Sequence, residues 1–144
     1  MGWHWRTHTH THTHGRAHTR ASAMNFICHC SVCRAASGGD ALAATAFAPH
    51  QLRWVNRAAM RATTPAGSAN TRLRCARCDS YVGEDASATL GVLAVPLASM
   101  RQPPAACLPN MHIFYASRAR DAHDALPKVR AACEEGGGVG AACI

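Results

Sequence analysis

The sequence has few aromatic residues and few acidic ones. Aromatic residues make up 6% of the 144 positions, and Asp and Glu together number 8 against 15 Lys and Arg. One domain is expected at this length. A chain with so few aromatic side chains builds only a modest hydrophobic core, so a bound metal would be a useful supplement to burial.

Signals for secretion and for membrane insertion are also missing. The opening residues, MGWHWRTHTH, contain no apolar region of the kind that a signal peptide needs. The longest apolar-leaning run, residues 86–100, is too short and too polar to cross a bilayer. Five of the eight cysteines stand in short metal-type spacings. We therefore expect the protein to work in the reducing cytoplasm without a membrane partner. Import into an organelle by the N-terminal residues stays open.

Acidic residues are absent from the first part of the chain, where positive charge accumulates. Residues 1–39 carry four arginines and no acid, and residues 40–80 carry six arginines against Asp40 and Asp79, within a net charge of +7. Such an imbalance can attract nucleic acid or anionic ligands. The arginines are scattered and have few aromatics between them, which favours a solvated basic surface over a nucleic-acid site.

Composition divides the chain into three parts. Residues 1–23 are rich in Thr and His and predict a disordered leader, whose histidines could bind metal adventitiously. Residues 24–128 are expected to form the folded zinc domain. Residues 129–144 are rich in Gly and predict a disordered tail.

Many short apolar runs and no long helical period predict a mainly β fold with short helical turns. A helical turn is expected at 31–36, and a terminal turn or short helix at 121–128. Residues 56–70 read as a variable connection. The expected strands are 24–27, 43–47, 52–55, 71–74, 90–95 and 111–116, of which the last is the clearest.

Three cysteines, Cys28, Cys30 and Cys33, stand within six residues at C-x-C-x-x-C spacing. In an extended segment residues i and i+2 point to the same side, so Cys28 and Cys30 can face one point, and the following turn brings Cys33 back toward it. Three thiolates this close are typical of a metal site, and zinc is the commonest metal for them. A fourth position is left for another protein atom or for a substrate.

A second pair, Cys75 and Cys78, has the C-x-x-C spacing of half a zinc site. A redox dithiol shares this spacing, but the βαβ pattern expected beside such a motif is absent. We therefore interpret the pair as metal ligands.

Four ordered stretches resemble the glutathione-dependent formaldehyde-activating enzyme family, which also includes centromere protein V. The first, CHCSVCRAASG, is similar to the family signature C-H-C-x-x-C-R-x-x-S-G. The others are RLRCARCDSYV, VPLASM, and HIFYASR followed by DALPK, and together they span roughly residues 24 to 128. The sequence departs from the family in two places. It has no G-x-C-x-C strand before the first motif, and Asp79 stands where the family usually has Gly.

The resemblance implies the β-tent fold and a zinc-dependent carbon–sulfur lyase reaction, in which glutathione and formaldehyde give S-hydroxymethylglutathione. It implies a catalytic zinc on Cys28, Cys30 and Cys33, and a structural zinc shared by Cys75, Cys78 and the missing cysteines. The expected partner is glutathione or a related small thiol. The alternative is a non-catalytic zinc module that associates with nucleic acid or chromatin.

Several other residues could contribute to such a site. Arg34, Arg53 and Arg74 could meet glutathione carboxylates, although each is expected to be simply exposed. His29 is expected to point away from the metal, and His112 to lie in the core or behind the ligands. The remaining thiols, Cys107, Cys133 and Cys143, are expected to be free.

Metal binding by the second cysteine pair has three possible outcomes. It can stay metal-free, borrow histidines from the leader, or join the first three cysteines around one ion. Ordering a long leader costs roughly 1–2 kcal/mol of backbone entropy per residue. We therefore predict one tightly held zinc per chain, on Cys28, Cys30 and Cys33, with the second site weak or empty.

Overall fold

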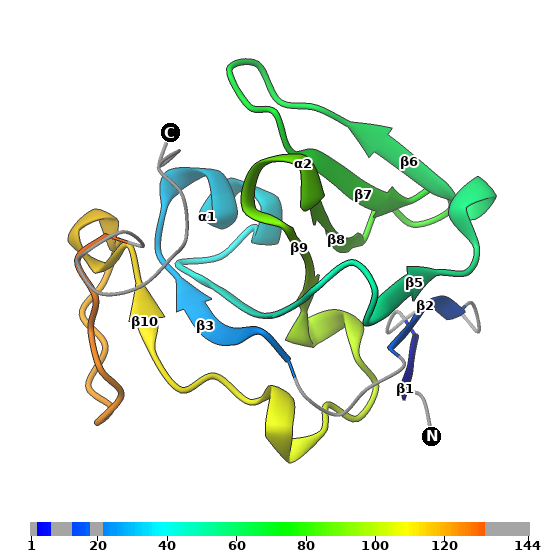
Figure 1. Ribbon diagram of the computed structural model, residues 1–144. Coiled ribbons are helices and arrows are strands. Elements are labelled where there is room, and N and C mark those ends of the chain that lie inside the picture. The colour runs from blue at the N-terminus through cyan, green and yellow to red at the C-terminus, as the bar shows by residue number, and fades with distance from the viewer. Residues whose placement is uncertain (1–2, 7–12, 18–21, 132–144) are drawn as a thin grey trace.

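The computed structural model describes residues 3–6, 13–17 and 22–131, and strands predominate in them (Figure 1). Seven strands form the larger sheet, namely β3 (Met24–Cys28), β4 (Leu42–Phe47), β6 (Met60–Thr63), β7 (Thr71–Cys75), β8 (Tyr81–Ala86), β9 (Val92–Pro96) and β10 (His112–Ile113). Their order is β10-β3-β4-β9-β8-β7-β6. This confirms the mainly β class.

All neighbours in this sheet are antiparallel except β10 and β3, which are parallel. The backbone N–H of Ile27 donates to Met111 O at 2.9 Å, and that of His29 donates to Ile113 O at 3.1 Å. On the far side of β10, His112 N–H donates to Pro127 O at 2.7 Å, and Val129 N–H donates to His112 O at 2.8 Å. The chain after residue 126 therefore lies along β10 and covers that edge of the sheet.

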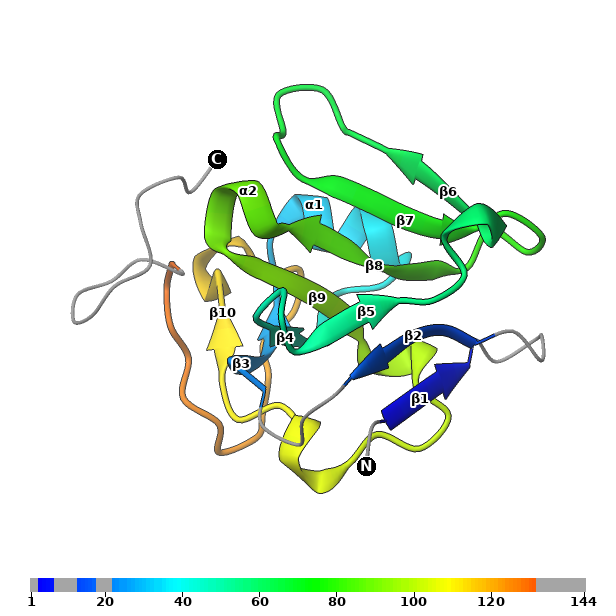
Figure 2. The ribbon, with the colours of Figure 1, turned by 45° about the vertical axis from the view of Figure 1, so that its right-hand side comes forward.

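A second, three-stranded sheet contains β1 (Trp3–Arg6), β2 (Thr13–Ala17) and β5 (Leu52–Trp54) in that order. Both neighbouring pairs are antiparallel, and the three strands lie together near the N-terminus (Figures 1 and 2). The expectation that the leader lies outside the fold is thus corrected for the residues of β1 and β2. The rest of residues 1–21 and the tail from residue 132 lie outside the described residues, and the boundaries 24–128 stay a prediction.

Helices are short throughout the described part of the chain. The α-helices are α1 (Ser31–Ser37) and α2 (Ser87–Leu90), and the 3-10 turns are η1 (Arg57–Ala59), η2 (Leu97–Ser99), η3 (Ala105–Cys107) and η4 (Tyr115–Ser117). α1 packs against β4 and lies at the end of β3. No helix among the described residues has the length and apolar character that crossing a membrane requires.

Trp54 of β5 connects two groups of buried side chains. It packs against one cluster made of Phe47, Leu52, Leu93, Val95, Met100 and Cys107. It also packs against a second cluster made of Met60, Leu73, Cys75 and Val82, together with Cys78. One large aromatic side chain therefore links the two sheets of a chain that has few others.

Gly83 in β8 makes room for this tryptophan. A Cβ atom at position 83 would lie 2.5 Å from Trp54 Cη2 and 2.6 Å from the carbonyl oxygen of Ala94. Neither distance is possible for a real Cβ atom, so the close approach of β8, β9 and Trp54 requires glycine there.

The sequence predicted six of the ten strands among the described residues, missed β1, β2, β6 and β8, and overextended one. β8 was missed because Gly83, Glu84 and Asp85 are rare in strands, and β6 falls in the segment read as a connection. The clearest predicted strand, 111–116, shrinks to β10, because Phe114 takes a left-handed conformation with φ 53° and η4 follows. Of the turn or short helix expected at 121–128, the described residues form bends at 124–126 and no helix, and Lys128 forms a β-bridge with His112.

We expect Gly83→Ala to destabilise the domain by about 1–3 kcal/mol, because Trp54 and the β9 backbone must move to admit the methyl group. Chemical denaturation measures the change. Gly39→Ala is the matched control, since a Cβ atom at position 39 meets its nearest neighbours at 3.8 Å. Equal stability of the two variants would contradict the packing described for Trp54.

Candidate metal centre

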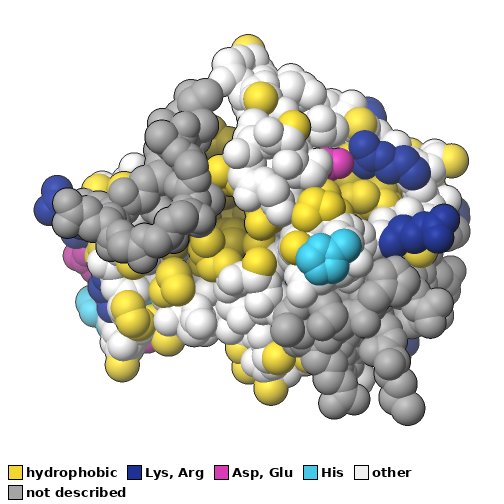
Figure 3. Space-filling model, in the orientation of Figure 1, with side chains coloured by type: hydrophobic (Ala, Val, Ile, Leu, Met, Phe, Trp, Pro, Cys, Tyr) yellow, Lys and Arg dark blue, Asp and Glu magenta, His cyan; other side chains and the backbone are white. Residues whose placement is uncertain are grey.

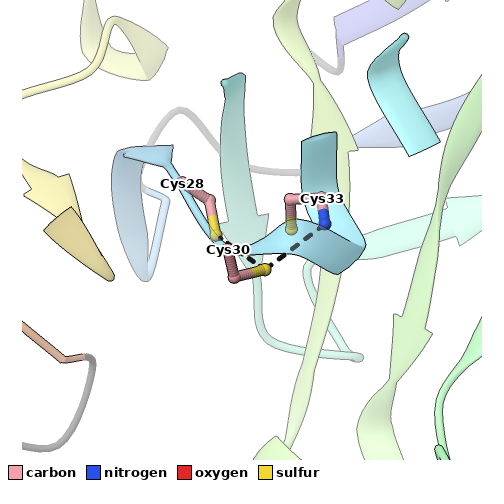
Figure 4. Close-up of side chains that lie close together, drawn as sticks. All are labelled: Cys28, Cys30 and Cys33. Atoms are coloured by element: carbon pink, nitrogen blue, oxygen red, sulfur yellow. Dashed lines mark hydrogen bonds between the residues drawn. The ribbon is translucent and has the colours of Figure 1, made fainter. Parts of the chain in front are cut away.

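The three cysteines of the C-H-C-x-x-C segment converge where β3 ends and α1 begins (Figure 4). Their sulfur atoms all lie within 4.8 Å of one another, and Cys28 Sγ and Cys30 Sγ are 3.5 Å apart. Cys28 is buried, whereas Cys30 and Cys33 are half-buried. We call Cys28, Cys30 and Cys33 the cysteine triad.

Local backbone structure explains this convergence. Cys28 is the last residue of β3, and Cys30 is the N-cap of α1, where its sulfur accepts a hydrogen bond from the Cys33 N–H at 3.3 Å. α1 ends at Gly38, whose left-handed φ of 72° lets its N–H donate to Arg34 O. The Arg74 guanidinium donates from β7 to Ala36 O at 3.0 Å and fastens the end of the helix to the sheet.

The cysteine triad fits a zinc ion in donor chemistry and in spacing. Two sulfurs bound to zinc at 2.3 Å in tetrahedral geometry lie about 3.8 Å apart. The observed separations agree with this value, since one pair is 3.5 Å apart and no pair is more than 4.8 Å apart. These three residues would hold the ion and leave its fourth position to another ligand.

The protons of the cysteine triad are unequally held. Hydrogen bonds from the Cys28 and Cys33 thiols lower the pKa of Cys30 to about 2. The same contacts act in the opposite sense on their donors: the hydrogen bond to Cys30, with burial, raises the pKa of Cys28 to about 12. The pKa of Cys33 is also raised, by its hydrogen bonds to Cys28 and Cys30 and by burial. Metal binding favours the thiolate form of all three.

Cys75 and Cys78 do not join this group. Cys75 ends β7 and is buried among Met60, Leu73 and Val82. Cys78 Sγ lies 3.1 Å from Ser80 Oγ. Among the described residues only the cysteine triad brings three potential ligand atoms within 4.8 Å. The described residues therefore do not bring the pair into the cysteine triad, and the role of the pair as ligands stays a prediction.

The turn after Cys78 keeps a glycine-like conformation without a glycine. Asp79 has a positive φ of 58°, and its N–H donates to Cys75 O at 2.9 Å. Its carboxylate pairs with Arg61 and, at 3.7 Å, with Arg74. Aspartate tolerates the left-handed region better than most side chains, so Asp79 can occupy a conformation that glycine also favours.

His29 points away from the sulfurs, as the alternation of an extended segment predicts. Its Nε2 lies 2.8 Å from His112 Nδ1, and its ring meets the Tyr115 ring edge-on at 5.1 Å between centroids. His112 Nε2 in turn lies 2.9 Å from Asp124 Oδ1. Burial lowers the pKa of His29, and the neighbouring His112 adds to this effect, so the neutral form is favoured. Sequence reasoning placed His112 in the core correctly but did not find its carboxylate partner.

A half-buried group of polar side chains at β7 and β8 was also missed. Glu84 accepts hydrogen bonds from Asn70 Nδ2 at 2.8 Å and from the Tyr81 hydroxyl at 3.2 Å, and it pairs across the strands with Arg72 at 3.8 Å. Burial raises the pKa of Tyr81, and the charges of Glu84 and Cys33 raise it further, so this phenol keeps its proton. The only available signal was an arginine and a glutamate near the second cysteine pair.

Two of the three arginines considered for substrate carboxylates are engaged with the backbone. Arg34 Nε donates to His29 O at 3.2 Å. Arg74 donates to Asp79 O at 2.8 Å as well as to Ala36 O, while Arg53 is exposed on β5. Cys107 is a free thiol buried in the core, as expected; Cys133 and Cys143 lie outside the described residues.

A comparison with protein families matches residues 13–117 with the family described as glutathione-dependent formaldehyde-activating enzyme. The matched segment begins within β2 and contains all five cysteines of the two motifs. No cysteine stands between residues 13 and 27. A search of curated proteins finds no match.

We expect Cys30→Ser to lower the zinc content of the purified, reduced protein from about one ion per chain to well below half, because one of three ligands is lost. Elemental analysis measures this directly. Cys143→Ser, outside the described residues, serves as the control and should leave the zinc content unchanged. Full zinc retention by Cys30→Ser would contradict the site.

We expect Cys78→Ser, in contrast, to leave the tightly held zinc in place, because Cys78 is not part of the cysteine triad. The measurement is zinc content after dialysis against a weak chelator. Loss of zinc to the level of Cys30→Ser would show that the second pair contributes a ligand.

Proposed function

Because the chain belongs to the glutathione-dependent formaldehyde-activating enzyme family, we propose that it is a zinc-dependent carbon–sulfur lyase acting on an adduct of formaldehyde with glutathione or a related small thiol. The observation that carries the proposal is the convergence of the three triad sulfurs within 4.8 Å. Three thiolates around zinc give a net charge of −1, which makes the centre a poor activator of water. Hydrolysis is therefore not its natural use.

In the synthetic direction the thiol sulfur attacks the carbonyl carbon of formaldehyde and a carbon–sulfur bond forms. The thiol proton is passed to the former carbonyl oxygen, which becomes the hydroxyl of the S-hydroxymethyl product. The lyase direction breaks the same bond and returns the same proton. Bound zinc would supply a position that holds the substrate sulfur as a thiolate at neutral pH.

The chain's own residues support this chemistry by fixing the ligands and limiting access of water. Cys28 is only 2% exposed, whereas Cys30 and Cys33 are half-buried. A substrate would therefore approach the site from the side of Cys30 and Cys33. Val32, between them in sequence, is 43% exposed and offers an apolar surface beside the site. The Tyr81 phenol, whose pKa is raised by burial and by the charge of Glu84, donates to the Glu84 carboxylate at 3.2 Å.

The alternative, a zinc module that binds nucleic acid, draws its support from the net charge of +7. Many of the described arginines are already paired with acids, namely Arg61, Arg72, Arg74, Arg118 and Arg120. On the face shown in Figure 3, Lys and Arg side chains lie toward the edges, whereas hydrophobic side chains gather near the middle. The enzyme proposal accounts for more of the observations.

We expect the zinc-loaded protein to speed the exchange between free formaldehyde and S-hydroxymethylglutathione at least about tenfold over buffer, equivalent to ~1.4 kcal/mol of barrier. Exchange NMR with ¹³C-formaldehyde and glutathione measures it against the spontaneous reaction. Cys33→Ser should return the rate to that of buffer. A zinc-loaded protein that leaves the exchange unchanged would refute this substrate pair.

A further inference from the structure

A chain of three hydrogen-bonded side chains runs from the surface to the middle of the C-H-C segment. Asp124 Oδ1 and Oδ2 lie 2.9 and 3.0 Å from His112 Nε2, and His112 Nδ1 lies 2.8 Å from His29 Nε2. The side chain of Asp124 is 46% exposed, whereas that of His112 is 2% exposed. His29 is likewise buried, at 5% exposure.

The donors and acceptors in this chain can be assigned from its outer end. The hydrogen bond from His112 holds the pKa of Asp124 below its ordinary value, so this carboxylate is ionised and can only accept. His112 Nε2 must then carry a proton. The contact between His29 Nε2 and His112 Nδ1 needs one donor. Placing that proton on His29 Nε2 leaves only a lone pair on His29 Nδ1, which burial tolerates better than an unpaired N–H donor. That buried atom has no hydrogen-bond partner among the described residues.

His29 is held at three places: its backbone N–H, its carbonyl oxygen and its imidazole ring. His29 N–H donates to Ile113 O at 3.1 Å, and its carbonyl oxygen accepts from Arg34 Nε at 3.2 Å. Cys28 and Cys30 flank this residue directly. Rotation of the His29 backbone would therefore move two of the three triad sulfurs.

Among the described residues, an aromatic ring packs on the two histidines and cationic side chains lie farther out. The Tyr115 ring packs on His29 and His112 with centroids 5.1 and 5.6 Å away. The outer groups are cationic: Lys128 Nζ lies 3.6 Å from Asp124 Oδ1, and Arg118 stacks over Tyr115 at 4.6 Å. Of the described residues, only Asp124 approaches His112 Nε2 with a carboxylate.

We propose that Asp124, acting through His112, fixes the Nε2–H tautomer of His29 and thereby holds Cys28 and Cys30 in the geometry that binds metal. Asp124 and His112 are positioning residues of the centre. This role rests on the zinc site of the proposed function, but not on the identity of the substrate. It links the segment around residue 124 to sulfur ligands about a hundred positions earlier in the chain.

The test replaces Asp124 by alanine and follows both the tautomer and the metal. In the wild-type protein, ¹⁵N NMR of the imidazole rings should show His29 with a protonated Nε2 and an unprotonated Nδ1. Asp124→Ala should shift these nitrogens toward averaged values, and it should weaken zinc affinity, measured by chelator competition, by roughly tenfold. Asp124→Asn keeps an oxygen for His112 and for the Leu126 N–H. The zinc affinity of this variant should therefore fall between those of the wild-type protein and Asp124→Ala.

Asp121→Ala is the matched control, because Asp121 is an exposed carboxylate nearby in sequence that pairs with Arg118 rather than with His112. It should leave both readouts unchanged. The proposal is overturned if wild-type His29 is protonated on Nδ1, or if Asp124→Ala leaves the tautomer unaltered. It is equally overturned if the tautomer changes while zinc affinity does not. Absence of formaldehyde exchange would refute the proposed substrate but leave these readouts intact.

Discussion

The structure depends most on the way β3 is held. Its last residue, Cys28, belongs to the cysteine triad, and the strand lies between β4 and β10, with one antiparallel and one parallel neighbour. α1 begins three residues later and turns Cys33 back toward the first two sulfurs. A strand fixed on both edges gives the site a rigid base. The short helix then needs only one turn to complete the cysteine triad.

The sequence was sufficient to predict the mainly β class and the clustering of Cys28, Cys30 and Cys33, because both follow from local spacing. It was not sufficient for features that depend on distant partners. β8 is a strand because Val82 is buried and Glu84 pairs with Arg72 of the neighbouring strand, neither of which its own propensity indicates. Asp124 belongs to the site only because the chain after β10 folds back along it.

The second cysteine pair shows that local spacing can also indicate a role that the surrounding packing does not reflect. Its C-x-x-C spacing predicted a ligand pair, and the turn does form, with Asp79 in the left-handed conformation. Cys75, however, faces the hydrophobic cluster around Leu73 and Val82. A buried cysteine behaves as a small apolar side chain, so this position contributes to packing whether or not a metal is bound nearby.

The pairing of β2 with β5 has a consequence for the solubility of the protein. β5 carries Trp54, which packs against both hydrophobic clusters, and β2 occupies one backbone edge of that strand. A form of the protein without residues 1–17 would expose the N–H and C=O groups of this edge. Such an open edge is a template for pairing with another chain. β2 would thus act as a cover that keeps copies of the domain from pairing through β5.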